Sequence, residues 1–387
     1  MIRTTILIFA IIAIGGAIWY LGSLKAHPST SMTSSPPSQD ENMLQKEDNN
    51  LKNLSTSTQK TIMNIQEDKA KKYEKYHEIT NPSGFINTDP ITIRSLIGKK
   101  VILVDFWTYS CINCQRTLPY LNGWYEKYKD KGFEIVSIHT PEFGFEKEKT
   151  NVQTAVKKYG ITYPVVMDND YGTWTAYNNR YWPRKYLIDI DGYIVYDHIG
   201  EGRYDETETK IQKLLNERKE RLELTDSVPS DMLHPDAIQV SATQVLSPEI
   251  YFGAARNTYL GNGKEGKTGE QTLTGPTGIK TNILYMVGNW NFDSEYAENT
   301  NPAKIIFRYN AKNVYMVASS NDGASMKIVL DGKPVSSDFA GEDVLSGEVY
   351  VKESSLYKLI KGDSYGEHTL ELIIDKPGLK AFTFTFG

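Results

Sequence analysis

The chain has 387 residues, which is enough for two or three domains, and its formal net charge is −5. Its 43 lysines and arginines are outnumbered by 48 aspartates and glutamates, so the basic excess typical of nucleic-acid-binding proteins is missing and we predict no such partner. The chain has only two cysteines and six scattered histidines, which argues against a structural zinc site with about four ligands.

An apolar stretch at residues 4–21 contains no charged side chain. As a helix rising about 1.5 Å per residue, it is long enough to cross the hydrocarbon core of a membrane. Arg3 precedes it, so the positive-inside rule places the rest of the chain outside the cytoplasm. A cleaved signal peptide is the alternative, although residues 23–26 (SLKA) lack a small-x-small cleavage site. We predict a single-pass transmembrane signal anchor over 1–26.

Residues 27–80 are predicted to form a flexible tether. Up to residue 58 the chain is rich in Ser, Thr, Pro, Asn and acidic residues, with few large apolar side chains. Residues 58–78 carry charges of both signs and could form an exposed helix. A flexible segment of this length would let the following domain meet membrane-bound or dissolved partners.

The stretch 101–119 carries the strongest functional signal. Residues 101–107 are mostly apolar and β-prone, as in a strand covered on both faces, and apolar residues after Cys114 recur at helical spacing. Cys111 would lie at the helix N-terminus, where free N–H groups and the helix dipole favour a thiolate. Cys114, one turn further, is placed to resolve the mixed disulfide that Cys111 forms. A bridge between such close residues adds little stability, so a redox-active pair is favoured over a structural one.

The segment VDFWTYSCINCQRTLPYL resembles the thioredoxin-like module of DipZ-type proteins, which are related to the TlpA-like and AhpC/TSA-like redoxins. The resemblance covers about residues 84–216 and implies an α/β thioredoxin-like fold. Alternating strand and helix patterns agree with a layered α/β domain over 81–221. We expect further strands at 133–140 and 163–168, a hairpin at 185–197, and helices at 147–159 and 205–221.

The resemblance also assigns roles to two carboxylates. Asp105 matches the buried aspartate beneath the thioredoxin active site, where an apolar strand should raise its pKa and let it take the proton from Cys114. Glu142 aligns with the active-site glutamate of TlpA-like reductases and would serve the same proton transfer. A hydrogen-bonded core aspartate and a solvated loop glutamate are the alternatives.

Three further residues are expected around the pair. Pro183 resembles the cis-proline that faces the CxxC pair and shapes the surface where a partner's backbone docks. Trp182, which precedes it, replaces the usual small or β-branched residue and is a candidate lid. Trp107 should pack beside the pair, with plain core packing as its default role.

Two departures from the relatives bear on the chemistry. Thioredoxins carry Trp before the first cysteine and Gly-Pro between the two, whereas here Ser110 precedes and Ile112-Asn113 intervene. These residues supply no charge that would fix the redox direction. Peroxiredoxins use Pro-x-x-x-Thr-x-x-Cys, and here Thr108 is present but Val104 stands at the proline position, which weakens a thiol peroxidase reading.

Residues 222–247 are predicted to be a linker, and 248–387 an all-β sandwich or jelly roll. Short alternating runs predict strands at 283–287, 304–309, 314–318, 326–330, 349–351, 369–374 and 382–386. The ends of this region resemble the C-terminal domain of DipZ-type proteins, which is similar to carbohydrate-binding modules. Sugar platforms use exposed aromatic rings, and Trp290 is the one tryptophan here, so core packing is the favoured role for it.

We therefore predict a membrane-anchored, periplasm-facing thiol–disulfide oxidoreductase that acts on exported proteins, with apocytochrome c as one candidate substrate. Its electrons would come from a separate membrane donor of the CcdA/DsbD type, and it needs no cofactor beyond the Cys111–Cys114 pair. The alternatives are a thiol peroxidase and a surface protein whose sandwich binds a glycan or protein ligand.

Overall fold

The computed structural model describes residues 56–236, 240 and 243–387. The predicted anchor over 1–26 and the tether up to residue 55 lie outside the described residues. Within the described part, no helix is long and apolar enough to span a membrane. The predicted linker over 222–247 also lies partly outside this range.

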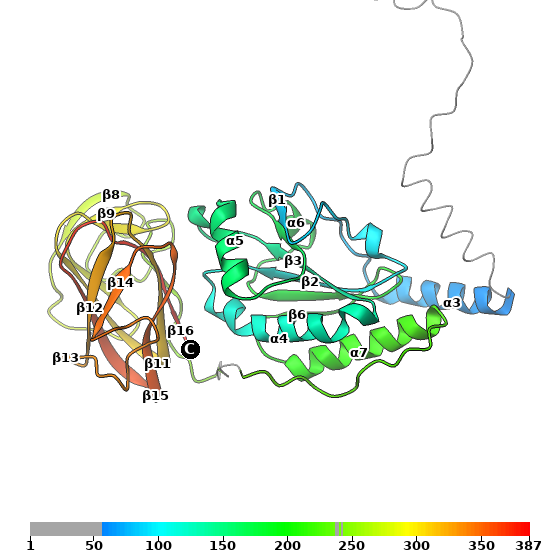
Figure 1. Ribbon diagram of the computed structural model, residues 1–387. Coiled ribbons are helices and arrows are strands. Elements are labelled where there is room, and N and C mark those ends of the chain that lie inside the picture. Colours follow the sequence, from blue (N-terminus) through cyan, green and yellow to red (C-terminus); the bar gives the residue numbers. More distant parts are fainter. Residues whose placement is uncertain (1–55, 237–239, 241–242) are drawn as a thin grey trace, which may run out of the picture. The chain divides into compact units, whose positions relative to one another are not determined.

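A six-stranded mixed sheet forms the centre of the first folded domain (Figure 1). Its order is β1 (Gly84–Ile86), β4 (Val165–Met167), β3 (Phe133–His139), β2 (Val101–Trp107), β5 (Arg184–Ile188), β6 (Ile194–Ile199). Strands β2, β3 and β4 are parallel, whereas β1, β5 and β6 run antiparallel to their neighbours. All seven residues of β2 are buried, as its unbroken apolar run predicts.

Helices cover both faces of this sheet. Helices α4 (Ile112–Tyr128), α5 (Lys149–Lys158) and α7 (Tyr204–Arg221) contribute to the core on one face, and Figure 1 shows α4 and α7 side by side. The other face packs against α6 (Gly172–Ala176) and the 3₁₀ turn η1 (Arg94–Leu96), while η2 (Lys129–Lys131) and η3 (Gly144–Lys147) are short connections. The predicted helix at 147–159 corresponds to α5, and η3 precedes it.

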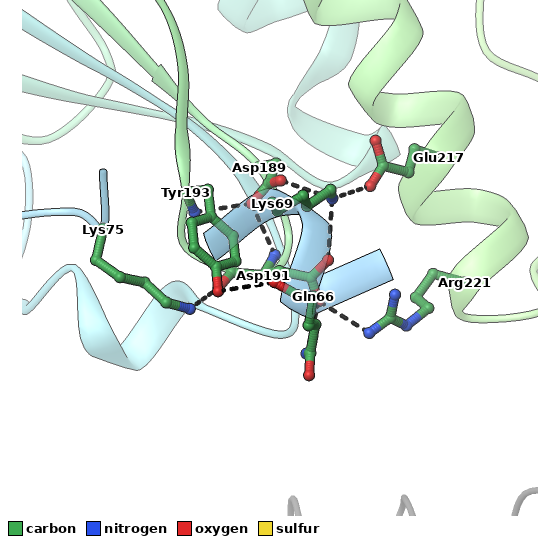
Figure 2. A network of polar contacts seen from close by, with 8 residues as sticks. All are labelled: Gln66, Lys69, Lys75, Asp189, Asp191, Tyr193, Glu217 and Arg221. Carbon is green, nitrogen blue, oxygen red and sulfur yellow. Dashed lines mark hydrogen bonds and ion pairs between the residues drawn. The ribbon is translucent and has the colours of Figure 1, made fainter. Parts of the chain in front are cut away.

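Helix α3 (Thr56–Lys72) is fastened to the β5–β6 turn by a charged network, shown in Figure 2. The Lys69 ammonium lies 2.7 Å from Asp189 and 3.0 Å from Asp191, and it also pairs with Glu217. Arg221 adds a second cation at 2.9 Å from Asp191. Burial alone would lower the pKa of Lys69, but its carboxylate partners outweigh burial and raise it.

The carboxylates of this network lie within 4.8 Å of one another, a spacing compatible with metal binding. Because the Lys69 ammonium lies among them and pairs with all three, the cluster already has a counter-charge. We therefore interpret it as a structural clasp between α3 and the sheet.

The second folded domain, called the C-terminal β domain below, comprises strands β7–β16 and packs around one large apolar core. Its antiparallel strands are β7 (Ile250–Tyr251), β8 (Gly269–Leu273), β9 (Leu284–Phe292), β10 (Ala297–Asn299), β11 (Ala303–Ser319), β12 (Ala324–Leu330), β13 (Lys333–Pro334), β14 (Glu348–Val351), β15 (Ser355–Ile374) and β16 (Lys380–Phe386). Trp290 is fully buried in this core, in agreement with its expected packing role.

One long strand differs from the sequence expectation. The strands predicted at 304–309 and 314–318 are one strand, β11, which pairs with β9 at one end, with β16 at the other, and with β15 along most of its length. Register shifts near Ala311 and Val314 interrupt this ladder. The polar segment between the two apolar runs therefore continues the strand, because its backbone is paired even where its pattern is not apolar.

Candidate redox site

Cys111 lies between the end of β2 and the first turn of α4. It is the N-cap of this helix, with φ −82° and ψ 117°, and its Sγ accepts a hydrogen bond from the N–H of Cys114 at 3.2 Å. Amide donors at a helix N-terminus stabilise negative charge on such a sulfur. Cys111 is half-buried while Cys114 is only 1% exposed, and both are free thiols. An incoming disulfide can therefore reach Cys111 more easily than Cys114.

Asp105 lies beneath the pair on β2 and is fully buried. Burial raises its pKa to about 6, against a smaller lowering by the charge of Lys185. Within the described residues, neither of its carboxylate oxygens has a hydrogen-bond partner. Burial also raises the pKa of Cys114, and the nearby Asp105 charge adds to that effect. Asp105 is thus a buried carboxylate with a raised pKa whose charge acts on the Cys114 thiol.

Lys185 is a site residue that sequence reasoning missed. It is directly opposite Asp105 in the antiparallel β2–β5 ladder and is fully buried. Burial lowers its pKa, while the charges of Asp105 and Cys114 act in the opposite direction. The signal was present in the sequence, because Lys185 directly precedes the apolar run Tyr-Leu-Ile of its strand, and a lysine that is buried there needs a counter-charge.

Glu146 is a second residue that sequence reasoning missed. It is fully buried, and its Oε1 accepts hydrogen bonds from the Oγ of Ser110 at 2.6 Å and from the backbone N–H of Ser110 at 3.3 Å. Its Oε2 accepts from the N–H groups of Glu142 and Phe143 at 2.6 and 3.0 Å. Burial raises the pKa of Glu146, although these donors oppose that shift. One carboxylate thus ties the cysteine turn to the loop after β3.

The side chain of Glu142, the glutamate predicted at the active site, is paired with the C-terminal β domain. Its Oε1 accepts hydrogen bonds from the Nη1 of Arg256 at 2.8 Å and the Oη of Tyr251 at 2.9 Å. Its own N–H is held by Glu146. Of the two glutamates in this short segment, Glu146 is the one in contact with the turn before Cys111.

The Trp182–Pro183 peptide bond is cis. Phe106 is opposite Arg184 in the β2–β5 ladder, so Pro183 lies level with Trp107 at the edge that leads to the cysteine turn. The indole N–H of Trp182 donates to the carbonyl of Thr140 at 3.0 Å, and its ring packs against Trp174 with centroids 4.2 Å apart. Trp182 is only partly buried and holds a fixed position beside the loop after β3.

Trp107 is fully buried under the turn. Its ring meets His139 edge to face at 5.2 Å, and Tyr109 stacks on the same histidine at 5.8 Å. Burial lowers the pKa of His139 to about 3, so this imidazole is neutral at physiological pH. The three rings form a rigid apolar floor for the site.

Comparison with known proteins agrees with this geometry. The redoxin family model matches residues 85–215, and the model described as thioredoxin like C-terminal domain matches residues 247–387. The thiol-disulfide oxidoreductase ResA of Bacillus cereus is 34% identical over 134 residues, which cover 34% of this chain and 74% of ResA.

Protein DipZ of Mycobacterium tuberculosis is 38% identical over 309 residues, which cover 79% of this chain and 42% of DipZ. The chain therefore spans less than half the length of that relative. Among solved structures, a thioredoxin-like protein in the oxidised form is 26% identical and aligns with 38% of this chain and 97% of its own, with a TM-score of 0.35.

Proposed function

This chain belongs to the thioredoxin-like redoxin family of thiol–disulfide oxidoreductases, and from that premise we propose that it reduces disulfides of exported proteins outside the cytoplasm. The observation that carries the chemistry is the half-buried Cys111 at the N-terminus of α4 with the buried Cys114 behind it. The location is supported by the apolar, uncharged stretch at residues 4–21 after Arg3.

The first step is attack on the substrate. The Cys111 thiolate attacks one sulfur of a substrate disulfide, which forms a Cys111–substrate mixed disulfide and breaks the substrate S–S bond. The second substrate sulfur leaves as a thiolate and takes a proton. The N–H of Cys114, in the first turn of α4, donates to the attacking sulfur.

The second step is resolution by Cys114. Asp105 takes the proton of the Cys114 thiol, and the resulting thiolate attacks the Sγ of Cys111. This forms the Cys111–Cys114 disulfide and releases the remaining substrate sulfur as a thiolate, which is then protonated. Two electrons have passed from the protein to the substrate. One of the two substrate protons is that of Cys114, carried by Asp105, and the other comes from solvent, so a separate electron donor must reduce the pair again.

The reducing direction is part of this proposal, and it requires a donor that reduces the Cys111–Cys114 disulfide again after each turnover. We propose that a membrane protein of the CcdA/DsbD type supplies the electrons.

The full chain in detergent tests this function with insulin as the disulfide substrate and dithiothreitol as the electron source. We expect insulin reduction well above the dithiothreitol background, and Cys111→Ser should abolish the gain. Hydrogen peroxide consumption is measured in parallel on the same samples. Faster Cys111-dependent removal of peroxide than of disulfide would contradict the proposal and establish a thiol peroxidase.

The proposed location has its own test. Residues 1–26 should keep the chain in the membrane pellet after alkaline carbonate washing. A chain that is released into the wash, or whose cysteines react only in the cytoplasm, would contradict the anchor and its orientation.

A further inference from the structure

The residue beside the nucleophile is covered by the C-terminal β domain. Ile112 directly follows Cys111 and is only 4% exposed. It belongs to a small apolar cluster that also contains Phe143 and four residues of the β domain, namely Tyr315, Val317, Leu356 and Phe382. One side of the cysteine turn is therefore closed by a different domain of the same chain.

The loop after β3 is held by the same domain. Phe143 and Phe145 both pack on Phe382, with ring centroids 5.1 and 4.9 Å apart. The N–H of Gly144 donates to the carboxylate of Glu295 at 2.8 Å. The apolar contacts are thus accompanied by a backbone hydrogen bond that fixes how the loop meets the β domain.

A polar latch lies at the edge of this contact. Arg256 donates to one carboxylate oxygen of Glu142, and its guanidinium stacks over the Tyr251 ring at 3.7 Å. The single hydroxyl proton of Tyr251 is shared between that oxygen, at 2.9 Å, and the carboxylate of Glu249, at 2.8 Å. The Glu142 side chain is only 14% exposed, so these two donors take the place of water as its hydrogen-bond partners. A carboxylate at position 256 would place two negative charges against each other and push the loop and the β domain apart.

The covered loop is joined to the redox turn. Glu146 binds Ser110 with one oxygen and the N–H groups of Glu142 and Phe143 with the other. The β domain, the loop and the turn before Cys111 therefore form one continuous set of contacts. Cys111 itself remains half-buried, so the β domain does not close the site completely.

We propose that the C-terminal β domain is a wall of the redox site that selects substrates by shape. It admits disulfides carried on extended or unfolded chain segments and excludes disulfides on the surface of compact domains. This inference rests on the proposed disulfide chemistry and adds the class of substrate to it.

The test presents one disulfide in two contexts to the full chain. A cysteine segment is joined to glutathione as a mixed disulfide, either in a free linear peptide or fixed on the surface of a compact host protein, so the leaving group is the same. We expect the wild-type rate constant for the peptide to exceed that for the folded host by at least about 100-fold.

Arg256→Glu should narrow this preference at least about tenfold by raising the rate on the folded host, while the rate on the peptide stays within about twofold. Arg308→Glu is the matched control, because Arg308 makes an exposed ion pair with Glu367 in the same domain. It should leave both rates unchanged. Tyr251→Phe, which removes one donor to Glu142 and keeps the ring, should shift the preference in the same direction by less.

The outcomes separate the two proposals. No reaction with either disulfide would contradict the proposed function itself. Equal wild-type rates on the peptide and on the folded host would contradict the proposed selection by the β domain, while the proposed disulfide reduction would still stand. The proposed wall would also be contradicted if the wild type strongly prefers the peptide and neither Arg256→Glu nor Tyr251→Phe reduces that preference. A cooperative thermal unfolding transition in both variants shows that they are folded in this test.

Discussion

At the scale of single residues, the two cysteines have different surroundings, and we propose different roles for them. Cys111 is half-buried at the start of α4, whereas Cys114 is almost fully buried and its pKa is raised. The sequence was sufficient to predict that Cys111 lies at the helix N-terminus, because the order strand, turn and helix decides which cysteine caps the helix.

Replacing the resolving cysteine should trap a substrate. In Cys114→Ser the mixed disulfide at Cys111 still forms, but no second thiol can displace it. We expect covalent substrate adducts on non-reducing gels that dithiothreitol releases. Cys111→Ser is the control and should give none. Adducts that form equally well with Cys111→Ser would show that Cys114 attacks first.

The resolution step should depend on the ionisation of Asp105. Its pKa is about 6, so the base is protonated and inactive below this pH and available above it. The resolution rate, measured by stopped flow on a preformed mixed disulfide, should rise through about pH 6 in the wild type. Asp105→Asn should slow resolution about 100-fold at pH 7 and move the rise to higher pH, since the Cys114 proton must then go to water.

A control separates proton transfer from charge balance around Lys185. Lys185→Met removes the opposing cation and should raise the pKa of Asp105, which shifts the pH profile upward without removing the base. An unchanged profile in Asp105→Asn would contradict a role for this carboxylate as the base.

Carboxylates in the loop were the part of the site that sequence patterns could not resolve. Glu142 and Glu146 are four residues apart in one irregular segment, where no helical or strand period tells which of them points inward. In the folded chain, the Glu146 side chain accepts a hydrogen bond from Ser110. The Glu142 side chain instead pairs with Arg256 of the other domain. A contact with a residue more than one hundred positions away has no local signal.

At the scale of elements, the clasp of α3 is the feature with the clearest energetic consequence. Lys69 neutralises Asp189 and Asp191, which are almost fully buried. Lys69→Met should therefore lower the free energy of unfolding of the first domain by about 3 kcal/mol, because it leaves buried carboxylates without their cation. Urea unfolding followed by tryptophan fluorescence measures this loss.

The same helix offers a matched control. Lys71 is 73% exposed and pairs with the exposed Asp68, so Lys71→Met should change the free energy of unfolding by less than about 0.5 kcal/mol. Equal effects of the two substitutions would mean that the clasp contributes no more than an ordinary surface pair.

Element types followed the sequence closely in the first domain and less closely in the second. The apolar strand β2 and the helical period after Cys114 are strong local signals, and both elements are present. In β15, by contrast, residues 355–368 lie outside the predicted strands, yet most of them pair with β11. Long-range pairing decides such strands, and it is not visible in a local pattern.

At the scale of the whole molecule, the chain combines a thioredoxin-like domain with a β domain that contacts the redox turn. Composition and the resemblance of two separate stretches were enough to predict both domains. Their contact was not predicted, because the aromatic residues that make it (Phe143, Phe145 and Phe382) look like ordinary core residues in the sequence.

The reduction potential of the Cys111–Cys114 pair tests the central claim most directly. It is measured on the full chain by tryptophan fluorescence across a series of thiol–disulfide buffers, with Cys114→Ser as the control that cannot form the bridge. We expect a single two-electron transition at about −250 mV or lower, the value of a reductant that a membrane carrier must supply with electrons. A transition near about −120 mV would mark a disulfide donor and contradict the reducing role.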